Sequence, residues 1–163
     1  RKVISVDASF KLTARGSRVG IVVVGCKGTY RYVVDNRTKP MGFGLTIETI
    51  ELLMKLHPDA KTVLIEDKAN GSAIVETLSS RVSGVVAVNP EGGKEARASS
   101  MEPAVRSGHW VLPEGAAWLD DYITEFGLFG TGAKNDQVDA TSQASIYLEQ
   151  DSSITRVLGM FKS

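Results

Sequence analysis

The hydrophobic and polar positions of this chain follow two different periods, and the change between them divides the sequence. Three early runs are rich in β-branched residues and too short for helices, which is typical of strands: K-V-I-S-V-D at 2–7, R-V-G-I-V-V-V-G-C at 18–26 and T-Y-R-Y-V-V-D at 29–35. Lys27 and Gly28 predict a tight turn, so the last two strands form a hairpin. We therefore expect the chain to begin with three antiparallel strands.

From residue 36 onward the pattern changes to alternating strands and helices. Residues 36–44 are rich in Pro, Gly and polar side chains and predict a loop. Thr46 is the expected N-cap of a helix that Pro58 ends. Further strands are predicted at 61–66 and 85–88, an edge strand at 110–112, and helices at 71–81, 94–107, 116–126 and 136–149. This order indicates an α/β fold with a mixed five-stranded sheet flanked by helices.

Length and composition fit one globular domain. The chain has 163 residues, 42% of them hydrophobic, which is enough for a sizeable core. We assign residues 1–149 to the domain and 150–163 to a C-terminal tail, and the start on a strand suggests a piece of a longer protein. Basic and acidic residues balance at 19 each, so a nucleic-acid site would depend on local charge placement. The single Cys26 fits a reducing compartment, and no apolar run is long enough to span a membrane.

Asp7 stands at the end of the first buried strand. An ionised carboxylate there needs a partner, because burying it dry and unpaired costs several kcal/mol. One interpretation is a turn-forming residue that caps the corner at Ala8 and Ser9. The other interpretations are a structural cation or a metal ion, and the positions of the remaining acids favour the metal.

Further acids fall where the fold would bring them to Asp7. The fourth predicted strand ends in Glu66 and Asp67, and if it lies parallel beside the first strand, its end and Asp7 share one edge of the sheet. Asp136 and Asp139 are three residues apart at the start of the last helix, so they share a face of that helix. Clustered carboxylates raise one another's pKa, and a divalent metal relieves that repulsion. We therefore predict a metal site at this edge.

Four segments carry a resemblance to a known family: V-D-A-S-F-K at 6–11, I-E-D-K-A-N-G-S-A at 65–73, N-P-E-G-G-K-E-A-R-A at 89–98 and K-N-D-Q-V-D-A-T-S-Q-A at 134–144. Together they resemble the nuclease domain of phage terminase large subunits, the DNA-packaging motor protein. The resemblance covers about residues 2–148 and implies an RNase H-like fold of the retroviral integrase superfamily.

The resemblance implies a site for two Mg²⁺ or Mn²⁺ ions and assigns its ligands. Asp7 would be the ligand from the first strand, Glu66 or its neighbour Asp67 the ligand from the fourth, and Asp136 the ligand from the last helix. Asp139 is either a ligand or a residue behind the ligands. Asp7, Glu66 and Asp136 are therefore the predicted catalytic residues.

The expected chemistry is hydrolysis of a phosphodiester. Two divalent ions roughly 3.5–4 Å apart can activate water, neutralise the phosphate and stabilise the leaving oxygen. Hard cations prefer the oxygen ligands that carboxylates supply, and the sequence has no Cys/His cluster suited to zinc. Many relatives have two adjacent acids at the start of the last helix, whereas Asn135 precedes Asp136 here. The number of acids that hold the second ion is therefore left open.

Basic residues near the acids predict contacts to DNA phosphates, which positive point charges bind without reading bases. They are Lys11, Arg15 and Arg18 after the first strand, Lys68 after the fourth, and Lys94 and Arg97 after the Gly-rich loop at 89–93. Each has an alternative interpretation as an ordinary solvated loop cation. The resemblance favours contact for Lys94 and Arg97.

Three hypotheses of function follow. The first is a metal-dependent endonuclease that cuts concatemeric viral double-stranded DNA in the host cell cytoplasm with little sequence preference. The resemblance gives it as partners the ATPase domain of the same full-length protein, the portal and the small terminase subunit. The second is a Holliday-junction resolvase or RNase H-type nuclease, and the third is a catalytically idle module that docks on DNA or the portal. The sequence lacks a Walker A motif, so we do not expect it to hydrolyse ATP by itself.

Overall fold

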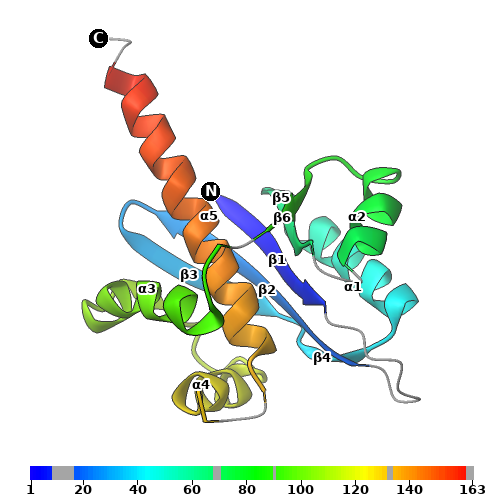
Figure 1. Ribbon diagram of the computed structural model, residues 1–163, viewed down its shortest axis with the longest axis horizontal. Coiled ribbons are helices and arrows are strands. Elements are labelled where there is room, and N and C mark those ends of the chain that lie inside the picture. The colour runs from blue at the N-terminus through cyan, green and yellow to red at the C-terminus, as the bar shows by residue number, and fades with distance from the viewer. Residues whose placement is uncertain (9–16, 68–70, 90, 132–133, 161–163) are drawn as a thin grey trace.

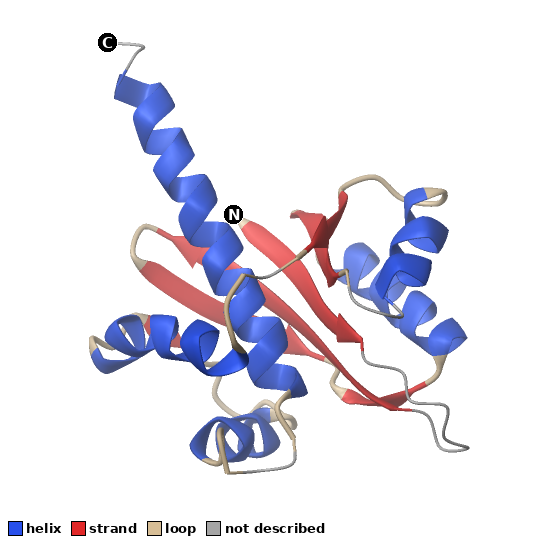
Figure 2. Cartoon of the chain, in the orientation of Figure 1, coloured by secondary structure: helices blue, strands red, loops and turns tan. Residues whose placement is uncertain are grey.

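The computed structural model of the chain describes residues 1–8, 17–67, 71–89, 91–131 and 134–160. Within these residues a seven-stranded sheet lies between two layers of helices (Figures 1 and 2). The strands are β1 (Lys2–Ala8), β2 (Ser17–Lys27), β3 (Tyr30–Asn36), β4 (Lys39–Met41), β5 (Ala60–Glu66), β6 (Val85–Val88) and β7 (Trp110–Val111). The helices are α1 (Phe43–Leu56), α2 (Gly71–Ser79), α3 (Lys94–Arg106), α4 (Leu119–Gly127) and α5 (Asp136–Met160).

The sheet is mixed, as the sequence predicts. Its strand order is β6-β5-β1-β2-β3-β7, and β4 pairs with β2 off this path. Strand β2 pairs antiparallel with both β1 and β3. Strand β5 lies parallel to β1, and β6 lies parallel to β5. The α/β class and the five predicted strands are confirmed, and the predicted edge strand exists as β7, parallel to β3.

Alternation along the strands sends side chains into two separate cores. Ile4, Val6 and their counterparts on β2 and β5 pack with residues of α1 and α2. The residues between them, such as Val3 and Leu64, pack with residues of α4 and α5 on the other face. Figure 1 shows α5 crossing this second face of the sheet, with α3 and α4 beside it. Both faces are covered, which explains the nearly continuous apolar runs of β1, β2 and β5.

The pairing of β1 with β5 fixes the edge at which the candidate site lies. Ser5 pairs with Leu64 and Val6 with Ile65 in a parallel ladder. The residues that follow, Asp7 and Glu66, therefore stand one position later on neighbouring strands that point the same way. The predicted parallel arrangement of these two strands is confirmed.

The segment between β3 and α1 differs from the prediction. The predicted loop at 36–44 contains β4, whose Pro40 argues against a strand in the sequence. Proline is tolerated here because β4 pairs with β2 alone. Helix α1 begins at Phe43 with Gly42 as its N-cap, so the predicted cap at Thr46 is wrong. The Thr46 hydroxyl instead donates a hydrogen bond to the Gly42 carbonyl at 2.9 Å within the first turn.

Helix α5 is longer than the sequence predicts. It runs to Met160, whereas the periodicity ends near Glu149, so the tail predicted at 150–163 begins inside the helix. Figure 1 shows the last turns of α5 extending past the sheet. An amphipathic pattern forms where a helix packs on a core, and it fades where the helix leaves that core. Helices α2, α3 and α4 lie within three residues of their predicted bounds, whereas the N-cap of α1 lies four residues before the predicted one.

Candidate functional site

Two acidic side chains lie at the carboxyl ends of β1 and β5. Val3 and Leu64 belong to the core beneath α4 and α5. Asp7 comes four residues after Val3 and Glu66 two residues after Leu64, so both acids face that same side of the sheet. Asp7 is 6% exposed and the Glu66 side chain 11%. The two carboxylates therefore meet in a largely buried place next to α5.

Asp67 lies in a different environment from Glu66. It is exposed, and its Oδ1 accepts a hydrogen bond of 2.6 Å from the Ser72 hydroxyl in the first turn of α2. Gly71 lets α2 begin this close to β5, because a Cβ at Gly71 would lie 1.8 Å from the Glu66 carbonyl oxygen. Of the two acids between which the sequence could not choose, Glu66 is the one that shares a face with Asp7.

The first turn of α5 brings the remaining acids to the same edge. Gly20 pairs with Asp7 in the β1–β2 ladder, and a Cβ at Gly20 would lie 2.2 Å from the Asp136 carbonyl oxygen. The missing side chain therefore lets the helix start directly on the sheet beside Asp7. Asp139, one turn into the helix, is 4% exposed.

The electrostatics of Asp7 show that these acids act on one another. Burial, together with the negative charges of Asp139, Glu66 and Asp136, raises the pKa of Asp7 to about 7, and these charges outweigh the opposing effect of Lys94. Asp139 contributes more to this pKa than Asp136 does. Burial also raises the pKa of Asp139, although Lys94 and Arg97 oppose that change. A carboxylate cluster of this kind costs folding free energy unless cations compensate it.

Helix α3 supplies cations to these acids. The Lys94 ammonium hydrogen bonds to the Asp139 carboxylate and, at 3.3 Å, to Asn135 Oδ1. The Arg97 guanidinium is 3.4 Å from Asp139 and 3.9 Å from Glu66. Burial alone would lower the pKa of Lys94, but its bond to Asp139 and the nearby acids raise it above the usual value. We call Asp7, Glu66, Asp139, Lys94 and Arg97 the Asp139 cluster.

Asp136 belongs to a second set of charges. Arg18 on β2 donates to Asp136 at 2.9 Å, to Glu125 at 2.6 Å and to Asp121 at 2.9 Å. Burial would lower the pKa of Arg18, but its hydrogen bonds to Asp136 and Glu125 raise it. Gln137 donates its side-chain amide to Glu125 and Asp121 at 2.7 and 3.0 Å. We call Arg18, Asp121, Glu125, Asp136 and Gln137 the Asp136 cluster.

The predicted DNA-binding cations have different outcomes. Lys11, Arg15 and Lys68 lie outside the described residues. Arg18 does not point to solvent as a phosphate-binding loop cation would, because it pairs with three acids. Lys94 and Arg97 lie at the predicted edge but contact its acids. A role for these two in DNA binding stays a prediction.

The donor set fits a hard divalent cation, because carboxylate oxygens are the ligands that Mg²⁺ and Mn²⁺ prefer. Nevertheless, among the residues that the structure describes, no three acidic, His or Cys side chains form a group that could hold one ion. Lys94 and Arg97 supply the positive charge at Asp139 and Glu66 instead. Metal binding at this edge therefore requires these carboxylates to exchange their contacts with Lys94 and Arg97 for contacts with the ion.

Several polar residues that support the site were missed in the sequence. Ser5 accepts a hydrogen bond of 3.0 Å from Gln143 on α5, which ties the strand of Asp7 to the helix of Asp139. One signal was present: Ser5 is a polar residue within an apolar strand, on the same face as Asp7. Glu125 and Gln137 gave no such signal, because their partners lie far away in the sequence.

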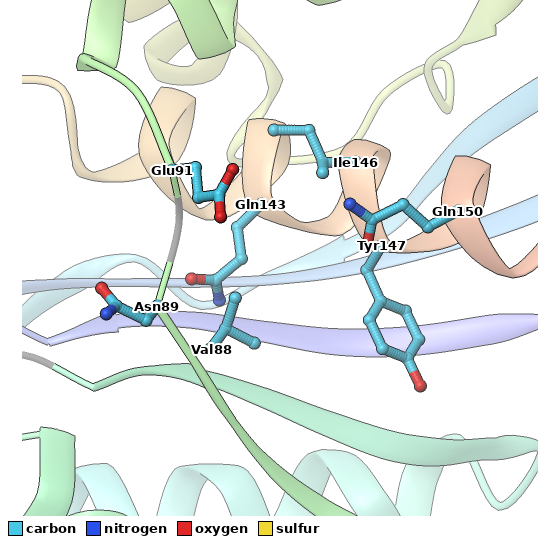
Figure 3. Close-up of a pocket in the computed structure, with 7 residues that line it drawn as sticks. All are labelled: Val88, Asn89, Glu91, Gln143, Ile146, Tyr147 and Gln150. Atoms are coloured by element: carbon cyan, nitrogen blue, oxygen red, sulfur yellow. The ribbon is translucent and has the colours of Figure 1, made fainter.

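A hollow of about 230 Å³ flanks the site between α5 and the chain that follows β6 (Figure 3). Its lining residues are Val88, Asn89, Glu91, Gln143, Ile146, Tyr147 and Gln150. Figure 3 shows the Gln143 carboxamide pointing away from Glu91, toward the side of the hollow where Val88 and Asn89 lie. This lining carries carboxamides and one acid but no cation, so the hollow does not suit a phosphate group.

Comparison with known families gives a match over most of the chain. A family model described as Terminase RNaseH-like domain matches residues 4–148. The matched region contains Asp7, Glu66, Asp136 and Asp139. No curated protein sequence matches the chain.

Solved structures with a similar fold include viral nucleases. The nuclease domain of human cytomegalovirus terminase aligns with a TM-score of 0.65 and 13% identity over 89% of this chain and 82% of its own. The large terminase nuclease of thermophilic phage G20c, with bound zinc, aligns at 0.66 and 15% over 88% and 80%. The fowlpox virus Holliday junction resolvase aligns at 0.58 and 14% over 92% and 99%. These likenesses and the family match confirm the predicted RNase H-like fold.

Proposed function

This chain belongs to the Terminase RNaseH-like domain family, the nuclease domain of phage terminase large subunits, and we propose that it hydrolyses double-stranded DNA with the help of divalent metal ions. One observation carries the proposal. Asp7 and Glu66, at the ends of adjacent parallel strands, share a buried edge with Asp139, and burial together with the negative charges of Asp139 and Glu66 raises the pKa of Asp7 to about 7. Buried acids that perturb one another in this way are typical of a functional site.

The acids would hold the metal, and the remaining side chains would prepare them for it. Asp139 and Glu66 raise the pKa of Asp7 more than Asp136 does, so Asp7, Glu66 and Asp139 are the proposed ligands, and Asp136 lies one turn of α5 away from Asp139. When bound, two Mg²⁺ or Mn²⁺ ions would neutralise the phosphate, lower the pKa of the attacking water and stabilise the leaving oxygen. Lys94 and Arg97 hold the acids until the ions arrive.

DNA would be held mainly by contacts to its backbone. If Asp139 held a metal ion, it would release the Lys94 ammonium, and that half-exposed side chain could reach a phosphate, together with Lys11, Arg15 and Lys68. Phosphate contacts carry no sequence information, so we expect little sequence preference, as suits the cutting of concatemeric viral DNA. The expected partners are the ATPase domain of the same protein, the portal and the small terminase subunit, in the host cell cytoplasm. No helix in the described part of the chain could cross a membrane.

The second candidate is a junction resolvase, because the fowlpox virus enzyme shares the fold over 92% of this chain. The terminase assignment is preferred since it rests on a family match in addition to the fold. Cutting of linear or supercoiled duplex in preference to four-way junctions and RNA/DNA hybrids supports the terminase nuclease, and the reverse preference supports the alternative.

The adjacent acids Glu66 and Asp67 offer a matched test of the proposed site. Glu66→Gln should reduce nicking of supercoiled plasmid in Mn²⁺ by more than the roughly 10–100-fold typical of residues that only orient a ligand. Asp67→Asn removes the same charge one residue away and should stay within a few-fold of the parent, because Asp67 faces Ser72 and solvent.

Equal activity of the two variants would contradict the site. If the parent chain neither nicks plasmid nor binds Mn²⁺ in calorimetry, the nuclease proposal fails and a module that docks on DNA or the portal becomes the better interpretation. Circular dichroism of both variants checks that the fold is retained.

A further inference from the structure

The first turn of α5 is capped by a residue from another helix. The first helical N–H groups have no partner inside a helix, and a side chain just before the helix normally accepts them. Here Glu125 on α4 does so: its Oε1 accepts the backbone N–H of Gln137 at 2.7 Å and that of Val138 at 3.4 Å. Asn135, in the position of the usual cap, accepts a hydrogen bond from Lys94 instead.

Glu125 is well placed to hold this turn rigidly. Its side chain is 2% exposed, and its other oxygen accepts from Arg18 at 2.6 Å and from the Gln137 side chain at 2.7 Å. The Gln137 side chain in turn accepts a hydrogen bond from Asn36 on β3. A buried carboxylate at the positive end of the helix dipole strengthens the same arrangement. The turn is thus tied to α4, β2 and β3 at once.

This turn carries the helix acids of the proposed site. Asp136 is its first residue and receives a hydrogen bond from the same Arg18. The backbone N–H of Asp139 donates to the Asn135 carbonyl at 2.8 Å, so Asp139 lies where the turn closes. Because Gly20 has no side chain, the turn lies directly on the sheet at this position. A shift of the helix start would therefore move both acids relative to Asp7 and Glu66.

We propose that Glu125, supported by Arg18, is a positioning residue that fixes the α5 acids for metal binding. The inference rests on the proposed function, because its consequence is a change in metal affinity. Glu125 would act through the backbone of Gln137 and Val138, whose N–H groups it accepts. Residues that orient ligands in this indirect way typically change metal affinity or activity by about 10–100-fold.

Glu125→Gln tests the role with little change in shape. Both oxygens of Glu125 face donors only, so a carboxamide must turn its NH₂ group toward a donor whichever way it is flipped. Asp120→Asn is the matched control, since it removes one negative charge from an exposed position on the same helix.

Three measurements separate the possible outcomes. Amide exchange followed by NMR should be at least about tenfold faster at Gln137 and Val138 in Glu125→Gln without metal, while the β1 and β5 amides stay protected. Calorimetry should show Mn²⁺ binding weakened about 10–100-fold. Plasmid nicking should recover toward the parental rate as Mn²⁺ is raised, because only the affinity for metal has changed. The Asp120→Asn control should match the parent in all three.

The failures of the two proposals are distinguishable. A parent that binds no Mn²⁺ and cuts no DNA overturns the nuclease, whereas a Glu125→Gln variant that binds Mn²⁺ like an active parent overturns the positioning role. If Glu125→Gln does not fold, Asp121→Ala replaces it, because Asp121 is 59% exposed and holds Arg18 and Gln137 from outside. That variant should weaken Mn²⁺ binding by a smaller factor, and unchanged affinity would again overturn the inference.

Discussion

The two clusters that meet at the first turn of α5 contain similar residues but balance their charges differently. In the Asp136 cluster, Arg18 lies among three carboxylates, and Glu125 also accepts backbone N–H groups. In the Asp139 cluster, three acids face one another, and part of the positive charge comes from Lys94, whose side chain is 46% exposed. The first arrangement is centred on the largely buried Arg18 and Glu125, whereas the second depends in part on a half-exposed cation that can leave.

The difference indicates separate roles for two acids only three residues apart. Asp136 is held within a network that also caps the helix, so its present contacts serve the fold. Asp139 faces Asp7 and Glu66, and the cost of bringing these charges together is recovered only in part by Lys94 and Arg97. Charges assembled at a cost to folding are expected where chemistry occurs.

Replacing Asp139 and Asp136 in turn with Asn tests most directly whether the two acids have different roles. Asp139→Asn should reduce plasmid nicking in Mn²⁺ by a factor on the order of 10³ or more, beyond the range of residues that only orient ligands. Asp136→Asn should reduce it by roughly 10–100-fold, because Asp136 contributes least to the electrostatics of Asp7. Single-turnover nicking rates provide the measurement. A larger loss in Asp136→Asn would reverse the assignment and restore the order of ligands that the sequence suggests.

For the free energy of unfolding we expect the reverse order, with the larger loss in the Asp136 cluster. Arg18→Ala leaves Glu125 as a buried acid without its cation and should lower the free energy of unfolding by roughly 3–5 kcal/mol. Lys94→Ala should cost no more than about 1 kcal/mol, since its side chain is half exposed and Arg97 still faces Asp139. Urea denaturation in EDTA measures both values. Similar losses in the two variants would show that the Asp139 cluster is equally important to the fold.

The smallest effect concerns the pH dependence of stability. The pKa of Asp7 rises from an ordinary 3.8 to about 7 on folding, so ionising this residue destabilises the folded state. The Asp7 contribution is therefore most favourable below about pH 4 and is lost as the pH rises toward 7. At pH 8 in EDTA, Asp7→Asn should unfold at a higher temperature than the parent, which corresponds to a gain of at most a few kcal/mol in the free energy of unfolding. At pH 4 the two proteins should unfold at nearly the same temperature. A difference that does not change with pH would contradict this cause.

The strand half of the site could be predicted from the sequence, because it follows from short-range pattern. Asp7 and Glu66 each end an apolar run, and the order of elements is enough to place those runs side by side. The alternation from Leu64 to Glu66 even distinguishes Glu66 from Asp67, although it requires knowing which face α5 covers.

For the helix half, the sequence predicts the edge at which Asp136 and Asp139 lie but not their counter-ions, because those cations come from distant parts of the chain. The D-x-x-D spacing shows that Asp136 and Asp139 share a face but not which cation each one meets. Arg18 is 118 residues away from Asp136, and Lys94 is 45 residues away from Asp139. Arg18 therefore resembles a loop cation in the sequence, while the folded chain uses it as an internal counter-ion.

Gly20 has a consequence for how such a site would be recognised from mutational data. It has no titratable group, yet any larger residue would collide with the carbonyl of Asp136 and lift the start of α5 away from Asp7. A saturation screen for nuclease activity would thus rank this glycine with the acids. Loss of activity on substitution of Gly20 would reflect the short distance between α5 and the sheet. Loss of activity alone would therefore wrongly identify Gly20 as a catalytic residue.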